Sequence, residues 1–156
     1  MDKAALHREL ISILEAALTT ARASHAAAVE GSTHEEARPE NDKDTRGLEQ
    51  SYLARGQAQR VAELEAAVAE TAALALRTFT AATPIALSAL VTVEENAARQ
   101  RYFVAAHGGG AVLAGGVQVV TPASPIGRVL LGRRIDDEIE LRLPAKLRTL
   151  VITDVA

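Results

Sequence analysis

The hydrophobic periodicity of this 156-residue chain changes once, at the segment TAATP, residues 80–84. Before it, apolar residues recur at alternating steps of three and four, which is the spacing of a helix that buries a narrow stripe. After it, apolar and polar residues alternate, which is the spacing of strands with one buried face. Because one segment cannot serve both periods, we predict a helical part, residues 1–79, followed by a strand-rich part, residues 80–156. The expected fold class is therefore α+β.

The helical part is predicted to be an antiparallel coiled-coil hairpin. Its first helix should cover residues 3–29, with a stripe formed by Leu6, Leu10, Ile13, Ala17, Thr20, Ser24 and Ala27. The second should run from about Asp44 to Phe79, with a stripe formed by Val61, Leu64, Val68, Thr71 and Ala75, and with Tyr52 packed in the same seam. Pro39 bars a helix through the polar segment between them, so the two helices fold back on each other.

The second part is predicted to be a small α+β domain. Strands are expected over residues 85–95, 100–106, 111–120, 137–143 and 147–155, separated by glycine, proline and acidic turns. Between the third and fourth strands, PIGRVLLG is expected to form about two turns of helix. Ser124 can cap this helix, Pro125 suits its first position, and Gly132 suits its left-handed end.

Composition limits the class of protein. Much of the 48% hydrophobic content is alanine and only 3% of residues are aromatic, which favours helices with a thin seam over a thick core. No apolar run approaches the roughly 20 residues of a membrane span, and MDKAALHREL lacks the pattern of a signal peptide. The absence of cysteine suits the cytoplasm. We therefore expect a cytoplasmic, monomeric protein without membrane contact.

Negative charge is concentrated in residues 30–44, which we call the tip segment. It contains six acidic and two basic residues, a net charge of −4, whereas the whole chain carries −3. A surface that binds duplex DNA would carry the opposite charge, so direct DNA binding is not expected. The tip acids could be a solvated turn in which Asp42 or Asp44 caps the second helix, or they could carry chemistry.

Other polar motifs indicate ordinary roles. His34 in HEE has no second histidine at helical spacing, so it does not form a zinc motif. The triple glycine after His107 lacks the lysine and the following helix of a phosphate loop, and is interpreted as a turn. Arg128, Arg133 and Arg134 could be solvated charges or a docking face, and the sequence pattern leaves both open.

The run SPIGRVLLGRRIDDEIEL, within residues 124–141, resembles the signature of the bacterial GreA/GreB transcript-cleavage factors. The resemblance extends over residues 85–155 in length and strand order. It implies an N-terminal coiled coil with an acidic tip and a C-terminal domain of FKBP-like fold. It also implies a partner, bacterial RNA polymerase, on which the C-terminal domain docks. The docking residues expected from this resemblance are Ser124, Pro125, Arg128, Arg133 and Arg134.

The resemblance further implies that the coiled coil enters the polymerase secondary channel and that tip carboxylates act at the polymerase active centre. The acids expected to act there are Glu40, Asp42 and Asp44, with Glu40 and Asp42 sharing a polymerase Mg²⁺. Glu40-Asn41 matches the Glu-Asn pair of the family tip, whereas Ala37 occupies the position of the family's aspartate. Mg²⁺ takes carboxylate and water oxygens, and a two-metal site stabilises both the attacking and the leaving oxygen.

The expected function is stimulation of the polymerase's own cleavage of backtracked RNA. The chain would then be an accessory factor rather than an enzyme, with no cofactor of its own. Because of Ala37, the alternative is a Gre-like regulator or inhibitor that occupies the channel without stimulating cleavage. Prolyl isomerases of FKBP-like fold have a pocket lined with aromatic residues. That activity is disfavoured here, because Tyr102 and Phe103 are adjacent in a predicted strand and should point to opposite faces.

Overall fold

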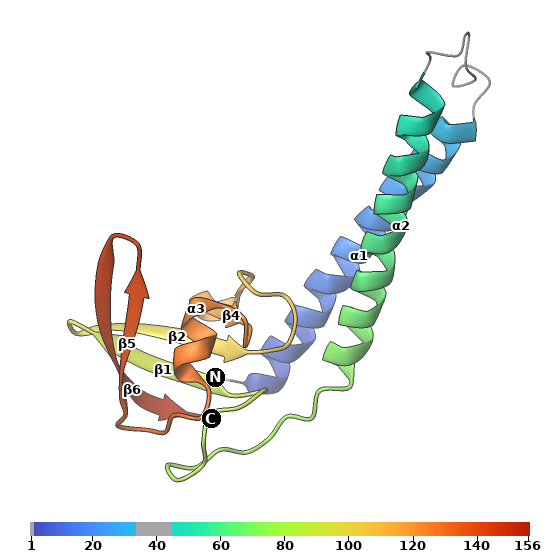
Figure 1. Cartoon of the computed structure of the whole chain (residues 1–156). Coiled ribbons are helices and arrows are strands. Elements are labelled where there is room, and N and C mark those ends of the chain that lie inside the picture. Colours follow the sequence, from blue (N-terminus) through green and yellow to red (C-terminus); the bar gives the residue numbers. More distant parts are fainter. Residues whose placement is uncertain (1, 34–44) are drawn as a thin grey trace. The chain divides into compact units, whose positions relative to one another are not determined.

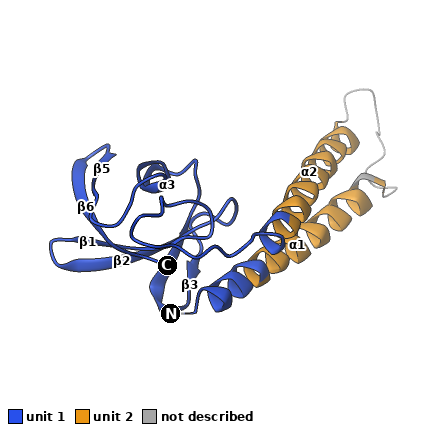
Figure 2. Cartoon of the chain, turned by 90° about the horizontal axis from the view of Figure 1, so that it is seen from below, with its two compact units in different colours: residues 1–11, 70–156 blue, residues 12–69 orange. Residues whose placement is uncertain are grey.

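The computed structural model describes residues 2–33 and 45–156, and it has the predicted α+β architecture (Figure 1). Two helices come first, α1 (Lys3–Thr33) and α2 (Arg46–Ala72). The chain divides into two compact units, one of residues 1–11 with 70–156 and one of residues 12–69 (Figure 2). No helix in the described ranges has the length and apolar content of a membrane span.

Residues 12–69 form a helical hairpin in which α1 and α2 pack side by side. Its core is the cluster of Leu18, Ala21 and Leu64, against which Ala17, Val61 and Val68 pack. Arg22 Nη2 of α1 donates to Glu65 Oε1 of α2 at 2.7 Å, across the two helices. Near the far end, a Cβ on Gly31 would lie 3.1 Å from Gln50 Oε1, so the Gln50 side chain of α2 reaches α1 there.

The predicted stripe of α1 is correct at Leu6 and Leu10 and in part at Ala17, which packs against the hairpin core, and it is wrong at the other four positions. Leu14, Leu18, Ala21 and Ala28 are buried, whereas Ile13, Thr20, Ser24 and Ala27 are exposed. Both sets repeat at steps of three and four, so the spacing alone does not distinguish them. The helix also continues through Gly31 to Thr33 instead of ending near residue 29.

The predicted stripe of α2 is correct at Leu64 and Thr71, which are both buried. The helix ends at Ala72 rather than near Phe79, so Ala75 lies outside it and is exposed. Tyr52 is wrong as a seam residue, because it is 59% exposed and the guanidinium of Arg55 lies 5.6 Å from its ring centre. In this part of α2, Gln50, Ala54 and Gln57 are half-buried, and the Gln50 side chain lies beside Gly31 of α1.

The remaining elements form a six-stranded sheet with one helix. They are β1 (Leu90–Glu95), β2 (Ala98–Val104), β3 (Val112–Leu113), the 3-10 turn η2 (Ala114–Gly116), β4 (Val117–Val120), α3 (Pro125–Leu130), β5 (Glu138–Leu143) and β6 (Lys146–Val155). The strand order is β3-β4-β2-β1-β6-β5. Only β2 and β4 pair in parallel, with Tyr102 opposite Gln118; the other four pairings are antiparallel.

The sheet buries its main core on one face, beneath α3. Val91, Val93, Tyr102, Leu150 and Ile152 belong to this core, and Leu130 of α3 is fully buried in it. The half-buried Ile126, Val129 and Leu131 pack against the same cluster. Phe103 is also fully buried but is not part of this cluster, as expected from the alternation that separates it from Tyr102.

Two predicted strands are interrupted by turns, and a third, predicted over residues 100–106, is β2 at Ala98–Val104. Residues 85–89 are not part of β1, because Ser88 has φ of 72° and begins an irregular segment that hydrogen-bonds to Val104. Residues 111–120 form two short strands instead of one, because Gly115 and Gly116 take positive φ and turn the chain between β3 and β4. In both places a local turn interrupts a run whose apolar content is typical of a strand.

Candidate functional site

The acids expected to carry chemistry, Glu40, Asp42 and Asp44, lie outside the described residues, as do His34 and Ala37. The helices on either side of them are described up to Thr33 and from Arg46. Among the described residues, no three His, Asp or Glu side chains gather into a group that could hold a metal ion. The role of the tip acids thus stays a prediction.

The expected docking residues are described. Ser124 and Pro125 lie at the start of α3, whereas the three arginines lie in its last turn and just after it. Ser124 Oγ accepts a hydrogen bond from the Gly127 N–H at 3.1 Å and donates one to the Thr121 carbonyl at 2.7 Å. Pro125 occupies the first helical turn, where its missing N–H costs nothing. The predicted cap and proline positions are confirmed, and together they fix the direction in which α3 leaves β4.

Gly127 is required by the close approach of α3 to the preceding turn. A Cβ at this position would lie 1.9 Å from the Thr121 carbonyl oxygen and 2.9 Å from Ser124 Oγ. Any side chain would therefore displace the turn that presents Ser124 and Pro125. The SPIG run is thus a structural unit in which serine, proline and glycine each meet a separate requirement of one turn.

The three expected docking arginines are all exposed, but they are not equivalent. The Arg134 side chain contacts the linker of residues 80–84, because its Nε donates to the Ala82 carbonyl at 3.0 Å. The backbone N–H of Arg134 donates to Asp137 Oδ2 at 2.8 Å. Arg128 lies in the last turn of α3, and Arg133 follows the helix after Gly132. Arg128 and Arg133 therefore offer cationic groups to solvent, whereas Arg134 also holds the linker in place.

Contacts within the first compact unit join the beginning of α1 and the end of α2 to the sheet. Glu9 Oε2 accepts from the Ala114 N–H at 2.9 Å, and His107 Nε2 lies 2.7 Å from Glu70 Oε2. His7 Nε2 lies 2.6 Å from the Thr71 carbonyl oxygen. The sequence pattern did not predict the contact of His107, because its partner, Glu70, is 37 residues away in the sequence.

Lys3, at the start of α1, contacts the segment that follows α2. Its Nζ donates to the Arg77 carbonyl and lies 5.0 Å from the centre of the Phe79 ring. Partial burial lowers the pKa of Lys3 from its ordinary value. Phe79 itself is buried in the sheet core. The segment after α2 therefore contacts the start of α1 through Arg77 and Phe79, and Phe79 also packs in the sheet core.

A polar network on the sheet was not predicted from the sequence. Arg148 of β6 contacts Glu95 Oε2 of β1 with Nε at 2.8 Å and with Nη2 at 2.6 Å. The same guanidinium donates to Gln100 Oε1 at 3.1 Å, and this oxygen also accepts from Tyr102 Oη at 2.6 Å. The hydrogen bond from Arg148 lowers the pKa of Glu95, and burial raises the pKa of Tyr102.

Comparisons with known proteins agree with this geometry. The family model "Transcription elongation factor, GreA/GreB, C-term" matches residues 82–156, which contain the capped helix α3 and the whole sheet. A search of curated proteins found no match.

Solved structures of similar proteins include the GreA factor homolog 1 (Gfh1) protein of Thermus thermophilus, with 20% identity, 97% of this chain and 95% of that chain covered, and a TM-score of 0.42. Gfh1 of Thermus aquaticus has 22% identity, 92% of each chain covered and a TM-score of 0.42. A GreA/GreB factor from Nitrosomonas europaea has 19% identity, 60% and 78% covered, and a TM-score of 0.40. Residues 82–156 therefore form a C-terminal domain of the GreA/GreB family of transcription elongation factors.

Proposed function

We propose that this protein binds bacterial RNA polymerase through its C-terminal domain and acts on the elongating enzyme as an accessory factor. The observation that carries the proposal is the match of residues 82–156 to the GreA/GreB C-terminal domain. The intact SPIG turn supports it, because Ser124 caps α3, Pro125 suits its first position, and a side chain at residue 127 would clash with the Thr121 carbonyl. Arg128 and Arg133 are proposed to contact acidic groups of the polymerase.

The helical hairpin is proposed to enter the secondary channel of the polymerase. At about 1.5 Å per residue, the 31 residues of α1 and the 27 residues of α2 extend over roughly 40 to 46 Å. Helices of this length suit a part of the factor that reaches into a channel. Most of its exposed residues are polar or alanine, which suits a channel filled with water, and a few large apolar side chains are also exposed: Ile13, Val29, Leu48, Tyr52 and Leu53.

At the far end, we propose that tip carboxylates stimulate the polymerase's own cleavage of backtracked RNA. Glu40 is the first candidate, because it belongs to the Glu-Asn pair that matches the family tip, and Asp42 and Asp44 follow it. Glu40 and Asp42 would share a Mg²⁺ with the polymerase and hold it together with water. No Mg²⁺ site or other cofactor of the factor's own is needed for this role.

A second function is favoured by one residue. Ala37 occupies the place of the family's tip aspartate, so one of the two expected carboxylates is missing in that register. A factor that docks without completing the metal site would occupy the channel and inhibit or reshape elongation. The two functions share the docking step and differ only in what the tip segment does at the active centre.

One experiment separates these functions. The purified protein is added to a stalled, backtracked elongation complex, and the length of the RNA and the occupancy of the polymerase are followed together. Shortened RNA supports cleavage stimulation. Binding with unchanged RNA and slower elongation supports channel occupancy. Absence of any polymerase binding, at low salt and at high protein concentration, contradicts the proposed function as a whole.

A further inference from the structure

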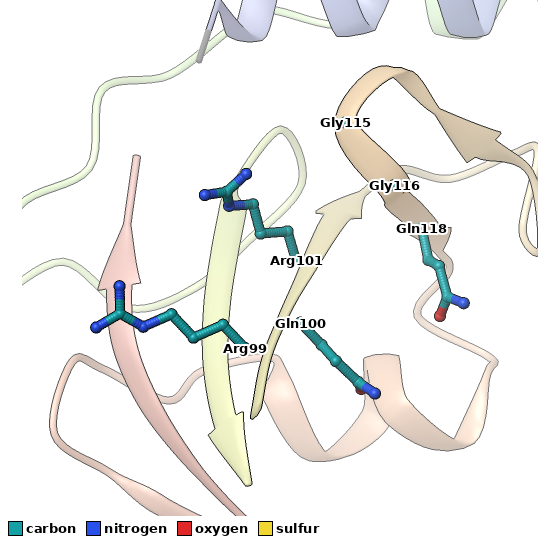
Figure 3. A pocket seen from close by; sticks show the side chains of 6 residues that line it. All are labelled: Arg99, Gln100, Arg101, Gly115, Gly116 and Gln118. Carbon is teal, nitrogen blue, oxygen red and sulfur yellow. The ribbon is translucent and has the colours of Figure 1, made fainter. Parts of the chain in front are cut away.

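The edge of β2 is open over its first residues. β4 pairs with β2 only along Tyr102–Val104, and no strand in the described part of the chain pairs with Ala98–Arg101 on that side. The chain before β4 turns away through Gly115 and Gly116, which both have positive φ. A notch of about 280 Å³ results, lined by Arg99, Gln100, Arg101, Gly115, Gly116 and Gln118 (Figure 3).

The backbone of β2 presents hydrogen-bonding groups to this notch. Leu90 of β1 exchanges both of its backbone hydrogen bonds with Ala156, at 2.9 Å each. Hydrogen bonding alternates along an antiparallel strand, so Val93 of β1 directs its backbone groups to β2, where it opposes Gln100. The backbone groups of Arg99 and Arg101 consequently point to the other edge, toward the notch.

The side chains around the notch carry positive charge. Figure 3 shows Arg99 and Arg101 extending to one side of β2 and Gln100 to the other. Arg99 Nε lies 3.4 Å from Glu94 Oε2, whereas Arg101 has no ion pair within the described residues. Both side chains are exposed, and they also line a second hollow of about 330 Å³, to which Asp154 contributes as well. None of the residues that line the notch is acidic.

We propose that this notch binds an extended segment of another protein, which adds to the sheet as a short strand in line with β4. Backbone pairing to Arg99 and Arg101 would supply the affinity, and alternate side chains would supply specificity. In an added strand, every second side chain lies on the face of Arg99 and Arg101, beside them. The partner segment therefore has the pattern acid-x-acid, with Asp or Glu at two alternate positions.

The probe for this site is a fluorescent peptide, acetyl-Thr-Glu-Val-Glu-Thr-amide, titrated with the full-length protein. We expect saturable binding, at least tenfold weaker for the peptide with both Glu replaced by Lys. Of two peptides N-methylated at successive amides, one should lose about three- to tenfold in affinity and the other should bind normally, because only alternate N–H groups face the neighbouring strand. If both methylated peptides bind as well as the parent, strand addition is refuted.

Variants of the protein locate the site. Arg99→Glu combined with Arg101→Glu should weaken the acidic peptide by about tenfold or more, while Arg142→Glu, an exposed arginine on the far strand β5, should leave it unchanged. Unchanged melting curves would show that each variant is folded.

Equal weakening by Arg142→Glu, or displacement of the peptide by inorganic phosphate at equal concentration, would overturn the proposal in favour of a general charge effect. So would sedimentation showing that a second copy of this chain fills the notch. Polymerase binding is measured separately, so failure here is distinguishable from failure of the proposed function.

Discussion

Arg148 and Glu95 are joined by a two-point contact between β6 and β1, with Nε and Nη2 of the arginine at 2.8 and 2.6 Å from one carboxylate oxygen. The two side chains come from strands that are 53 residues apart in the sequence. Both are largely shielded, with 15% and 24% of their side-chain surfaces exposed. The contact also orients Gln100, which accepts from Arg148 and from Tyr102.

This pair should give the protein a specific acid sensitivity. The Arg148 hydrogen bond keeps the pKa of Glu95 below its ordinary value of 4.5, so the stabilisation is present when the carboxyl is ionised and is lost as the pH falls through and below 4.5. Glu95→Gln should lower the melting temperature by about 2 °C at neutral pH. The difference between the two proteins should shrink below about pH 4. Melting curves followed by circular dichroism between about pH 3 and about pH 7 test this prediction. A difference in melting temperature that grows on acidification would contradict it.

The close approach at Gly127 predicts a large effect of the smallest substitution. Gly127→Ala places a Cβ 1.9 Å from the Thr121 carbonyl oxygen, so the turn or the helix must move. We expect a loss of about 2–4 kcal/mol in the free energy of unfolding and weaker polymerase binding. The matched control is Gly56→Ala on α2, where a Cβ meets nothing within 4 Å. It should be neutral or stabilise by up to about 1 kcal/mol. Urea unfolding of both variants gives the comparison.

The corrected seam of α1 is tested by two neighbouring residues. Leu14 is 6% exposed and Ile13 is 37% exposed. Leu14→Ala should cost about 2–4 kcal/mol because it removes buried methyl groups and leaves a cavity, whereas Ile13→Ala should cost less than about 1 kcal/mol. Thermal unfolding monitored by helical circular dichroism distinguishes them. Equal costs would show that the helix is rotated relative to the seam described above.

Docking is predicted to depend on Arg128 and Arg133, which are exposed at the end of α3 and just after it. Reversing both charges, with Arg128→Glu and Arg133→Glu, should weaken polymerase binding by about tenfold or more at low salt and less at high salt. Arg142→Glu serves as the matched control because Arg142 is an exposed arginine on another strand. A competition assay with labelled wild-type protein measures the affinities. Equal affinity of the double variant and the control would remove this surface from the docking site.

The tip acids are predicted to affect cleavage and not docking. If Glu40 or Asp42 holds Mg²⁺ at the polymerase centre, Glu40→Ala or Asp42→Ala should slow cleavage by about 10²-fold or more, because a ligand of the metal in the transition state is removed. Asp44→Ala tests the third candidate. Glu15→Ala, at an exposed acid of α1, is the control and should have no effect. Polymerase affinity should stay the same in all four variants. Cleavage that persists unchanged when all three tip acids are replaced would show that they do not act on the metal.

The sequence alone determined the class of fold, because the hydrophobic period changes from three-four to two at residues 80–84 and a period is a local property of the chain. It also determined the turn before α3, since Ser124 and Pro125 act on neighbouring backbone groups. The stripe of α1 could not be settled in this way, because the sets containing Ile13 and Leu14 have the same spacing and only packing against α2 separates them.

Only the tertiary structure decided which distant groups meet. The partners Arg148 and Glu95, His107 and Glu70, and Glu9 and Ala114 are 37 to 105 residues apart, and no local pattern couples them. The open edge at Arg99 and Arg101 is likewise a consequence of register, because β4 begins its pairing at Tyr102. A strand's own residues specify that it is a strand and which face is apolar. Where its neighbour stops is fixed by the turn at Gly115 and Gly116, and this decides which backbone groups remain available to a partner.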